Sequence, residues 1–431
     1  MNIFKFGGAS VKDAEGVKNV VEVLKVTGHK QKVVVVSAMG KTTNALERVI
    51  SCYFNKESQL SQEINDLEMY HQVILDQLFS NRSHEVYSKV SAFFSDLKRF
   101  LKHNKSPKYD FVYDQVVGYG ELISTTIISN YLQNIGLENQ WLDVRSCIQT
   151  DSTYRDAKVN WETSQEAIQA QVNKSSLTIT QGFIGADDNN YTTTLGREGS
   201  DYTAGIFAYC LNAESVTIWK DVQGVLNGDP REFENTTLLE QISYEEAIEL
   251  AFYGASVIHP KTLQPLQRKE IPLYVKSFLN PTTQGTAVSK GQTLVPHTPC
   301  FIVKKNQVLI SLSSLDFSFI VEDNISEIFS LFHKYQMKVD LIQNSAISFS
   351  VVLNNKYGGL DELLDELKET FKVSVDKEVS LFTVRHFNQI SLKHIKKLDQ
   401  NILLEQRTHK TLQLVLSKNF KQENLLGFFE R

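Results

Sequence analysis

The chain has 431 residues, which is enough for two or three domains. Hydrophobic residues make up 42% of it and charged residues 22%, which is typical of a soluble globular protein. The formal net charge of −5 argues against a general nucleic-acid-binding protein, and no apolar run is long enough to cross a membrane. Four scattered cysteines predict reduced thiols, and the first residues predict a strand rather than a signal peptide, so we expect a cytoplasmic protein.

Residues 2–6 predict a short apolar strand that Lys5 interrupts. A lysine within a buried strand is costly unless it meets an anion. Gly7 and Gly8 then predict a tight turn into a helix, which favours a phosphate as the partner of Lys5. The alternative is an edge strand with Lys5 in solvent. The chain contains neither a Walker P-loop nor the motifs of protein kinases.

Further apolar strands alternate with helical stretches up to about residue 278, and this pattern predicts a three-layer α/β sandwich around a parallel sheet. The expected strands after the first are 33–37, 177–181, 215–219 and 272–276. Ligands bind at the carboxyl ends of strands in such sheets. The residues at these ends are Lys5, Ser37, Gly182 and Asp221.

Residues 55–106 interrupt the alternation and predict a helical insertion beside the site. Its first apolar stripe consists of Leu60, Ile64, Leu67, Ile74, Leu75 and Leu78. Plain helical packing is the favoured interpretation, and a lid over the site is the alternative.

Residues 196–205, Gly-Arg-Glu-Gly-Ser-Asp-Tyr-Thr-Ala-Gly, follow a polar hairpin and open a predicted helix. Ser200 and Asp201 stand where N-caps stand, so free N–H groups of the new helix are expected nearby. Arg197 supplies a two-pronged cation for a carboxylate or phosphate. The stretch therefore predicts an anion site, and a plain helix start with a surface arginine is the alternative.

Residues 279–300 are rich in Pro, Thr and Gly and predict a linker. Beyond it, strands and helices follow in the order β-α-β-β-α-β, which is ferredoxin-like. A second, shorter unit follows, with strand-like segments and a terminal helix but no room for a full first helix; its segments are 379–386, 401–407, 410–417 and 421–430. We thus expect a catalytic domain over 1–278, a linker over 279–300 and a regulatory region over 301–431 whose second unit is reduced.

Eight motifs in order resemble those of aspartate kinases over nearly the whole chain. The N-terminal Lys-Phe-Gly-Gly-Ala-Ser-Val and the Gly-Arg-Glu-Gly-Ser-Asp of 196–201 are two of them. The others are 37–44 (SAMGKTTN), 118–121 (GYGE), 181–185 (QGFIG), 219–225 (WKDVQGV), 229–231 (DPR) and 254–260 (GASVIHP). The resemblance implies the amino-acid-kinase fold, a three-layer αβα sandwich, followed by ACT-type regulatory units.

The reaction that the resemblance implies is the transfer of a phosphoryl group from ATP to the side-chain carboxylate of L-aspartate, the first step toward lysine, threonine and methionine. This nucleophile is already ionised at pH 7, so no protein base is required and catalysis depends on positioning and charge neutralisation. Lys5 and Asp201 are the implied catalytic residues: Lys5 bridges the transferring phosphoryl group, and Asp201 organises the cations around it.

The resemblance also implies the residues that bind L-aspartate. Arg197 and Ser200 would bind its carboxylates, Glu121 its ammonium group, and Thr43 would donate a hydroxyl hydrogen bond. The alternative for Glu121 is a glutamate that the dipole at a helix start favours.

ATP and Mg²⁺ are the expected cofactors, the cation being held mostly by phosphate oxygens and water, and no cluster of His and Cys predicts a metal site in the protein. The implied ATP-binding residues are Lys5, Gly7, Gly8, Ser10, Lys220, Asp221, Leu226, Arg231 and Ser256. A plain turn is the alternative for the Asp229-Pro230 segment next to Arg231.

Two positions depart from the family pattern. Ala9 replaces the usual Thr near the phosphates, and Ser256 replaces a lysine that meets the nucleotide. Two outcomes are open for Ser256: a lower affinity for ATP, or compensation by Lys220 or Lys261. Because Lys5 and Asp201 are retained, we expect an active enzyme.

The expected partners are L-aspartate, an amino-acid effector (lysine or threonine) at the ACT-like region, and a second copy of the chain in a homodimer; we expect no nucleic acid and no membrane. A kinase for glutamate or N-acetylglutamate is one rival hypothesis. A catalytically weak amino-acid sensor is the other, and both ACT units serving mainly for dimerisation remains open.

Overall fold

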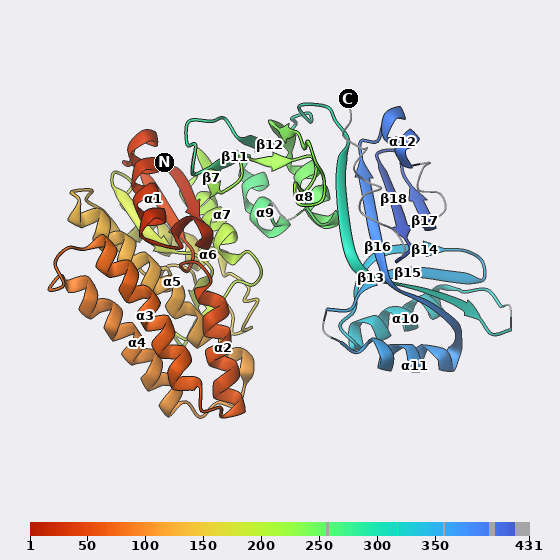
Figure 1. Cartoon of the computed structure of the whole chain (residues 1–431), viewed down its shortest axis with the longest axis horizontal. Coiled ribbons are helices and arrows are strands. Elements are labelled where there is room, and N and C mark those ends of the chain that lie inside the picture. The colour runs from red at the N-terminus through yellow and green to blue at the C-terminus, as the bar shows by residue number, and fades with distance from the viewer. Residues whose placement is uncertain (256–257, 317, 357, 396–400, 419–431) are drawn as a thin grey trace. The chain divides into compact units, whose positions relative to one another are not determined.

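The computed structural model describes residues 1–255, 258–316, 318–356, 358–395 and 401–418 (Figure 1). The chain divides into two compact units. The first comprises Met1–Val225, Leu238–Ile248 and Val257–Leu294, and the second Leu226–Thr237, Glu249–Ser256 and Val295–Arg431. Among the described residues, no helix is long and apolar enough to cross a membrane.

An eight-stranded sheet forms the centre of the first unit. Its strands are β1 (Asn2–Phe6), β2 (Lys32–Val36), β3 (Gln140–Leu142), β4 (Leu177–Gln181), β7 (Ser215–Lys220), β10 (Gln241–Ser243), β11 (Leu273–Ser277) and β12 (Thr286–Ser289). They follow the order β10-β12-β11-β7-β1-β2-β4-β3, and the pairs from β11 to β3 are all parallel. Strand β12 runs antiparallel to β11 and lies within 279–300, so the segment expected to be a linker contributes a strand to this sheet.

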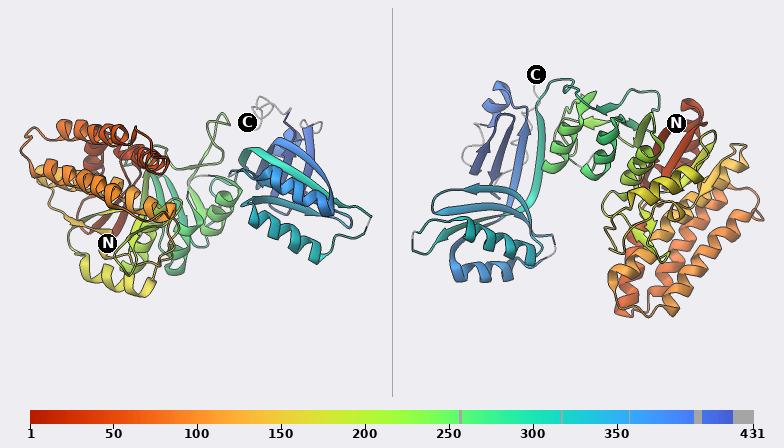
Figure 2. Two further views of the ribbon diagram at one scale, coloured as in Figure 1. Left: turned by 90° about the horizontal axis from the view of Figure 1, so that it is seen from below. Right: turned by 180° about the vertical axis from the view of Figure 1, so that it is seen from behind.

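Helices cover both faces of the sheet. The helices up to residue 269 are α1 (Ala14–Thr27), α2 (Thr42–Asn55), α3 (Leu60–Leu78), α4 (Glu85–His103), α5 (Tyr109–Asn134), α6 (Trp161–Gln171), α7 (Gly199–Leu211), α8 (Tyr244–Tyr253) and α9 (Pro260–Lys269). Helices α3 and α4 pack on α2 and α5, and the second half of α8 belongs to the second unit. Apolar side chains of α1–α5 share one core with Phe4 and Phe6 of β1, while α7 packs on the other face with α6 and α9 beside it (Figure 2). The predicted three-layer sandwich is confirmed.

Side-chain alternation along β1 decides which face each residue serves. Phe4 and Phe6 point toward α1, so Lys5 between them points toward α7. The remaining short elements are the 3₁₀ turns η1 (Gly8–Val11) and η2 (Val144–Ser146), the hairpin strands β5 (Ile184–Ala186) and β6 (Thr192–Thr194), and β8 (Val225–Leu226) and β9 (Leu238–Leu239).

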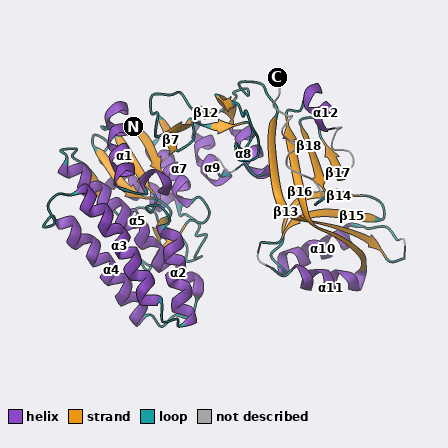
Figure 3. Ribbon diagram, in the orientation of Figure 1, coloured by secondary structure: helices purple, strands orange, loops and turns teal. Residues whose placement is uncertain are grey.

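The second unit contains one antiparallel sheet of six strands in the order β14-β15-β13-β16-β18-β17 (Figure 3). Its elements are β13 (Cys300–Ser314), α10 (Glu322–Lys334), β14 (Lys338–Asn344), β15 (Ser348–Asn354), α11 (Leu360–Thr370), β16 (Phe371–Arg385), α12 (Gln389–Ile395), β17 (Ile402–Arg407) and β18 (Thr411–Leu416). The first ferredoxin-like unit is present as predicted.

The second ferredoxin-like unit has four strands rather than the three predicted. The first half of β13 pairs with the second half of β16, from Cys300 opposite Arg385 to Lys304 opposite Leu381, and so supplies the fourth strand. Helix α12 has only seven residues, and the helix predicted over 421–430 lies outside the described residues.

Candidate active site

A buried ion pair lies at the carboxyl end of the central strand. Lys5 on β1 and Asp201 on α7 are 9% and 3% exposed, and the lysine Nζ lies 2.6 Å from the carboxylate Oδ1. Lys5 therefore meets an anion, as its buried position requires, and the anion comes from the second glycine-rich stretch. The Lys5–Asp201 ion pair brings into contact the two stretches that the sequence singled out.

The turn after β1 passes close to the end of β2. A β-carbon on Gly8 would lie 2.7 Å from the Ala38 carbonyl oxygen, so only glycine fits there. The Gly40 N–H donates to the Gly8 carbonyl at 3.0 Å, which joins the two turns. Ser10 is buried, and its hydroxyl lies 3.4 Å from the carbonyl oxygen of Trp219 on β7. Gly7, Gly8 and Ser10 thus lie between the ends of β2 and β7.

The start of α7 differs from the prediction. The N-cap is Glu198, in the left-handed region with φ +53°, and Ser200 and Asp201 are the second and third residues of the helix. The N–H of Asp201 donates to the Glu198 carbonyl at 3.0 Å, so this donor is not free for a ligand. Ser200 instead packs against the turn after β4, where a β-carbon on Gly182 would lie 2.6 Å from its hydroxyl oxygen.

Glu121 is the most desolvated carboxyl of the site. It lies on α5, is 2% exposed, and accepts a 3.4 Å hydrogen bond from the Ala38 N–H through Oε1. Its Oε2 atom is buried without a hydrogen-bond partner. Burial raises the pKa of Glu121 to about 8. A cation placed beside Oε2 would restore the charged form.

Thr43 and Arg197 belong to two different parts of the chain, the start of α2 and the loop before α7. Thr43 is half-buried in the first turn of α2, directly after the loop that contains Ala38. Arg197 is exposed in the loop between β6 and α7, one residue before the N-cap Glu198. Thr43 directly follows the buried Thr42, and Arg197 lies four residues before Asp201 in the sequence.

The predicted nucleotide-binding residues divide between the units. In the first unit, Lys220 is the last residue of β7, and Asp221 is exposed directly after it. In the second unit, Leu226 is half-buried and Arg231 pairs with Asp229, with 2.6 Å between Nη2 and Oδ2. Ser256 lies outside the described residues.

The side chain of Lys261, a candidate to compensate for the lysine that Ser256 replaces, already has other partners. It forms an ion pair with Asp156, and its Nζ donates to the Leu195 carbonyl at 3.1 Å. His259 caps α9 by accepting from the Lys261 N–H at 3.2 Å, so its role in the structure is local.

Sequence reasoning missed several residues that shape the site. The Ala38 N–H contacts Glu121, and Phe183, with φ +72°, lies against Gly199. His71 of α3 contacts Thr42, and its only sequence signal is its place in the apolar stripe between Leu67 and Ile74, at helical spacing.

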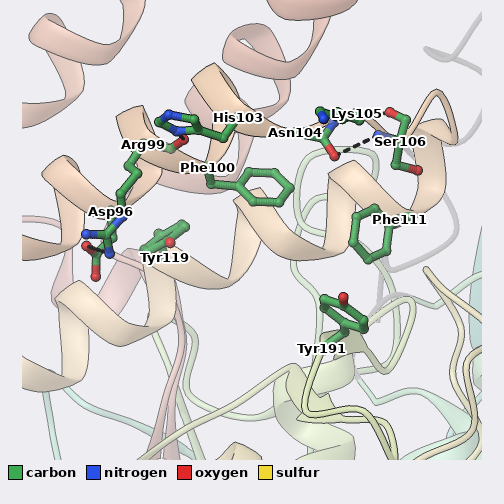
Figure 4. A pocket seen from close by; sticks show the side chains of 10 residues that line it. All are labelled: Asp96, Arg99, Phe100, His103, Asn104, Lys105, Ser106, Phe111, Tyr119 and Tyr191. Atoms are coloured by element: carbon green, nitrogen blue, oxygen red, sulfur yellow. Dashed lines mark hydrogen bonds and ion pairs between the residues drawn. The ribbon is translucent and has the colours of Figure 1, made fainter.

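A separate cavity of about 740 Å³ lies between the end of α4, the start of α5 and the β5–β6 hairpin (Figure 4). It is lined by Asp96, Arg99, Phe100, His103, Asn104, Lys105, Ser106, Phe111, Tyr119 and Tyr191. None of the predicted site residues lines it. Within the described part of the chain, no group of three or more His, Cys, Asp or Glu residues could hold a metal ion.

Comparisons with known proteins identify the family of this chain. Residues 1–277 match the model of the amino acid kinase family. Lysine-sensitive aspartokinase 3 of Escherichia coli (strain K12) is 30% identical over 390 residues, which cover 88% of this chain and 85% of the relative. Aspartokinase 1, chloroplastic, of Arabidopsis thaliana is 29% identical over 398 residues, covering 87% and 68%.

Solved structures are similar over almost the full length. The crystal structure of E. coli aspartokinase III in complex with aspartate and ADP has a TM-score of 0.82 at 26% identity and covers 99% of this chain and 98% of that chain. Clostridium acetobutylicum aspartate kinase has a TM-score of 0.81 at 21% identity, with 100% and 99% coverage, and shares the fold.

Proposed function

Because the chain belongs to the amino acid kinase family and, within it, to the aspartokinases, it is an ATP-dependent kinase of L-aspartate, and we propose that the cluster around Lys5 and Asp201 carries the transfer. The observation that supports this assignment is the buried pair itself, 2.6 Å long, at the carboxyl end of β1. Ligands of open α/β sheets bind at such ends.

The reaction needs charge neutralisation rather than a base. An oxygen of the substrate carboxylate bonds to the γ-phosphorus of ATP while the bond from that phosphorus to the β–γ bridging oxygen breaks and ADP leaves. The Lys5 ammonium neutralises charge on the transferring oxygens, and Asp201 holds that ammonium in place. A cation fixed by a buried partner needs little reorganisation during the step.

Glu121 is the proposed partner of the substrate ammonium. Its buried Oε2 without a protein partner is the atom that such a cation would satisfy. Arg197 and Ser200 would bind the carboxylates, and Thr43 would donate a hydroxyl hydrogen bond. In the free protein Glu121 Oε2 has no hydrogen-bond partner, and the substrate ammonium would supply one.

The nucleotide would contact the β1 turn and the end of β7. Gly7, Gly8 and Ser10 would face the phosphates; the other proposed ATP contacts are Lys220, Asp221, Leu226, Arg231 and Ser256. The donor set fits Mg²⁺ as a companion of ATP: the exposed Asp221 offers hard oxygens, and phosphate oxygens and water would supply the remaining ligands.

The second unit is the proposed regulatory region, with lysine or threonine as effector and a homodimer as the assembly. Two observations support this proposal. The six-stranded sheet of the second unit is built from two ferredoxin-like units, and the relative from E. coli is named lysine-sensitive. The four cysteines are free and buried, which fits the proposed cytoplasmic location.

Trapping the product with hydroxylamine tests the assignment. Hydroxylamine converts an acyl phosphate to a hydroxamate, so the wild type should give an ATP-dependent signal with L-aspartate and little with L-glutamate. Lys5→Ala should lower the rate by at least about 10²-fold. Lys32→Ala removes another buried strand lysine, at the opposite end of the neighbouring β2, and should retain the rate.

A wild type that binds ATP but gives no hydroxamate with L-aspartate would contradict the kinase assignment and favour an amino-acid sensor. A signal with L-glutamate alone would favour a different acceptor.

A further inference from the structure

Two adjacent side chains of α3 contact two loops of the proposed active site, the one proposed to bind the phosphates of ATP and the one proposed to bind L-aspartate. Tyr70 contacts the segment after the β1 turn, and His71 contacts the start of α2 after the β2 loop. Helix α3 belongs to the insertion for which plain packing was the favoured interpretation. These contacts are polar and specific, and we call Tyr70 and His71 the α3 clamp.

Tyr70 lies where the two loops meet. Its hydroxyl donates a hydrogen bond to the Lys12 carbonyl, on the segment that follows the β1 turn. The same hydroxyl would lie 2.6 Å from a β-carbon at Gly40, whose φ is +55°. Because the Gly40 N–H also donates to the Gly8 carbonyl, Tyr70 covers the point that joins the turns.

His71 is completely buried, and both ring nitrogens have a hydrogen-bond partner. Nδ1 lies 2.8 Å from the Leu67 carbonyl oxygen, which can only accept, so the proton is on Nδ1. Nε2 is then an acceptor, 3.4 Å from the hydroxyl of Thr42, the first residue of α2. The neutral ring fits this arrangement, since burial lowers the pKa of His71 to about 4.

A histidine is a poor choice for packing alone. The neighbouring positions of the stripe, Leu67, Ile74 and Leu75, are apolar and buried, and an apolar residue at position 71 would cost nothing in desolvation. The imidazole is useful where it can accept from Thr42, which adjoins Thr43 in the proposed aspartate site.

We propose that the α3 clamp positions the two substrate loops: His71 sets the start of α2 for L-aspartate, and Tyr70 sets the β1 turn for the phosphates of ATP. This inference rests on the proposed function of the site. Tyr70 and His71 are positioning residues, since neither is placed against a substrate.

Substitutions at the two positions should therefore affect different Michaelis constants. His71→Leu should raise KM for L-aspartate about three- to tenfold, the effect of one lost hydrogen bond, with KM for ATP changed less than twofold. Tyr70→Phe should act mainly on KM for ATP and on kcat. His71→Gln places an amide oxygen near the Nε2 position and should recover most of the aspartate affinity.

Leu75→Ala is the matched control, because it weakens the packing of the same helix, one turn after His71, without removing a hydrogen bond to either loop. Thermal unfolding of every variant measures the general loss of stability. If Leu75→Ala shifts KM for L-aspartate as much as His71→Leu does, or if His71→Leu leaves it unchanged, the clamp is wrong.

Calorimetric titration with L-aspartate separates this failure from failure of the proposed function. Lower aspartate affinity in His71→Leu than in Leu75→Ala supports the clamp even if turnover uses another acceptor. Equal affinities in an active enzyme refute the clamp and leave the kinase assignment intact.

Discussion

The two sides of the proposed active site differ in how their charges are held. On the phosphoryl side, Lys5, Asp201 and Glu121 are 9%, 3% and 2% exposed, and the first two are paired. On the nucleotide side within the first unit, Lys220 is half-buried at the end of β7 and Asp221 is exposed. Charges in a low dielectric act strongly and are weakly screened, whereas exposed charges are screened by water and salt. We therefore expect the phosphoryl side to control the chemical step and the binding of L-aspartate, and the nucleotide side to control the affinity for ATP.

The largest effect should come from breaking the buried pair. Asp201→Asn leaves the Lys5 ammonium without its partner, so kcat should fall by about 10²- to 10³-fold and the free energy of unfolding by about 3 kcal/mol. Steady-state kinetics and denaturant unfolding measure the two losses.

The double variant Lys5→Met, Asp201→Asn separates them. It removes both charges, so stability should return while activity stays low. Full activity in Asp201→Asn would show that the buried charge does not act in the transfer step.

Glu121 should make aspartate binding depend on pH. With a pKa of about 8 in the free protein, most of this carboxyl is protonated at pH 7 and cannot pair with an ammonium group. If only the ionised form binds, KM for L-aspartate should fall about eightfold as the pH rises from 7 to 8.5. Initial rates over this range measure the change.

Glu121→Gln should have a higher KM that is flat over the same range. The raised pKa also means that the free protein loses stability as the pH rises from about 4.5 toward 8, since the unfolded carboxyl ionises first. The variant should lose this slope as well. A slope in KM that survives in Glu121→Gln would assign the titration to another group.

From the sequence, the residues of the candidate site could be predicted better than the contacts between them. An anion beside Lys5 follows from the cost of a buried lysine, but that it is Asp201 depends on packing between residues 196 positions apart in the chain. The helix start was misplaced because Glu198 adopts a left-handed conformation that local preference does not favour. His71 was missed because a lone histidine in an apolar stripe resembles core.

The errors in the fold have a similar origin. Strand β12, Thr-Ala-Val-Ser, is too short and polar to be distinguished from a linker, and its pairing with β10 and β11 defines it. The first half of β13 is separated from the second by an irregularity near Asn306, with φ +57°, so the sequence pattern suggested only one strand. Sequence patterns predict the elements that have strong apolar runs, whereas short or polar strands are defined by their pairing with distant strands.

The smallest effect should come from the exposed side. Asp221→Asn removes one exposed carboxylate at the end of β7, so KM for ATP should rise about three- to tenfold at saturating L-aspartate, with little change in kcat. Raising the magnesium concentration should reduce the difference if this carboxylate contacts the cation. Asp188→Asn, an exposed aspartate of the β5–β6 hairpin, is the matched control and should behave as the wild type. A loss in kcat as large as that of Asp201→Asn would mean that exposure does not separate the two sides, because an exposed charge would then contribute as much to the transition state as a buried one.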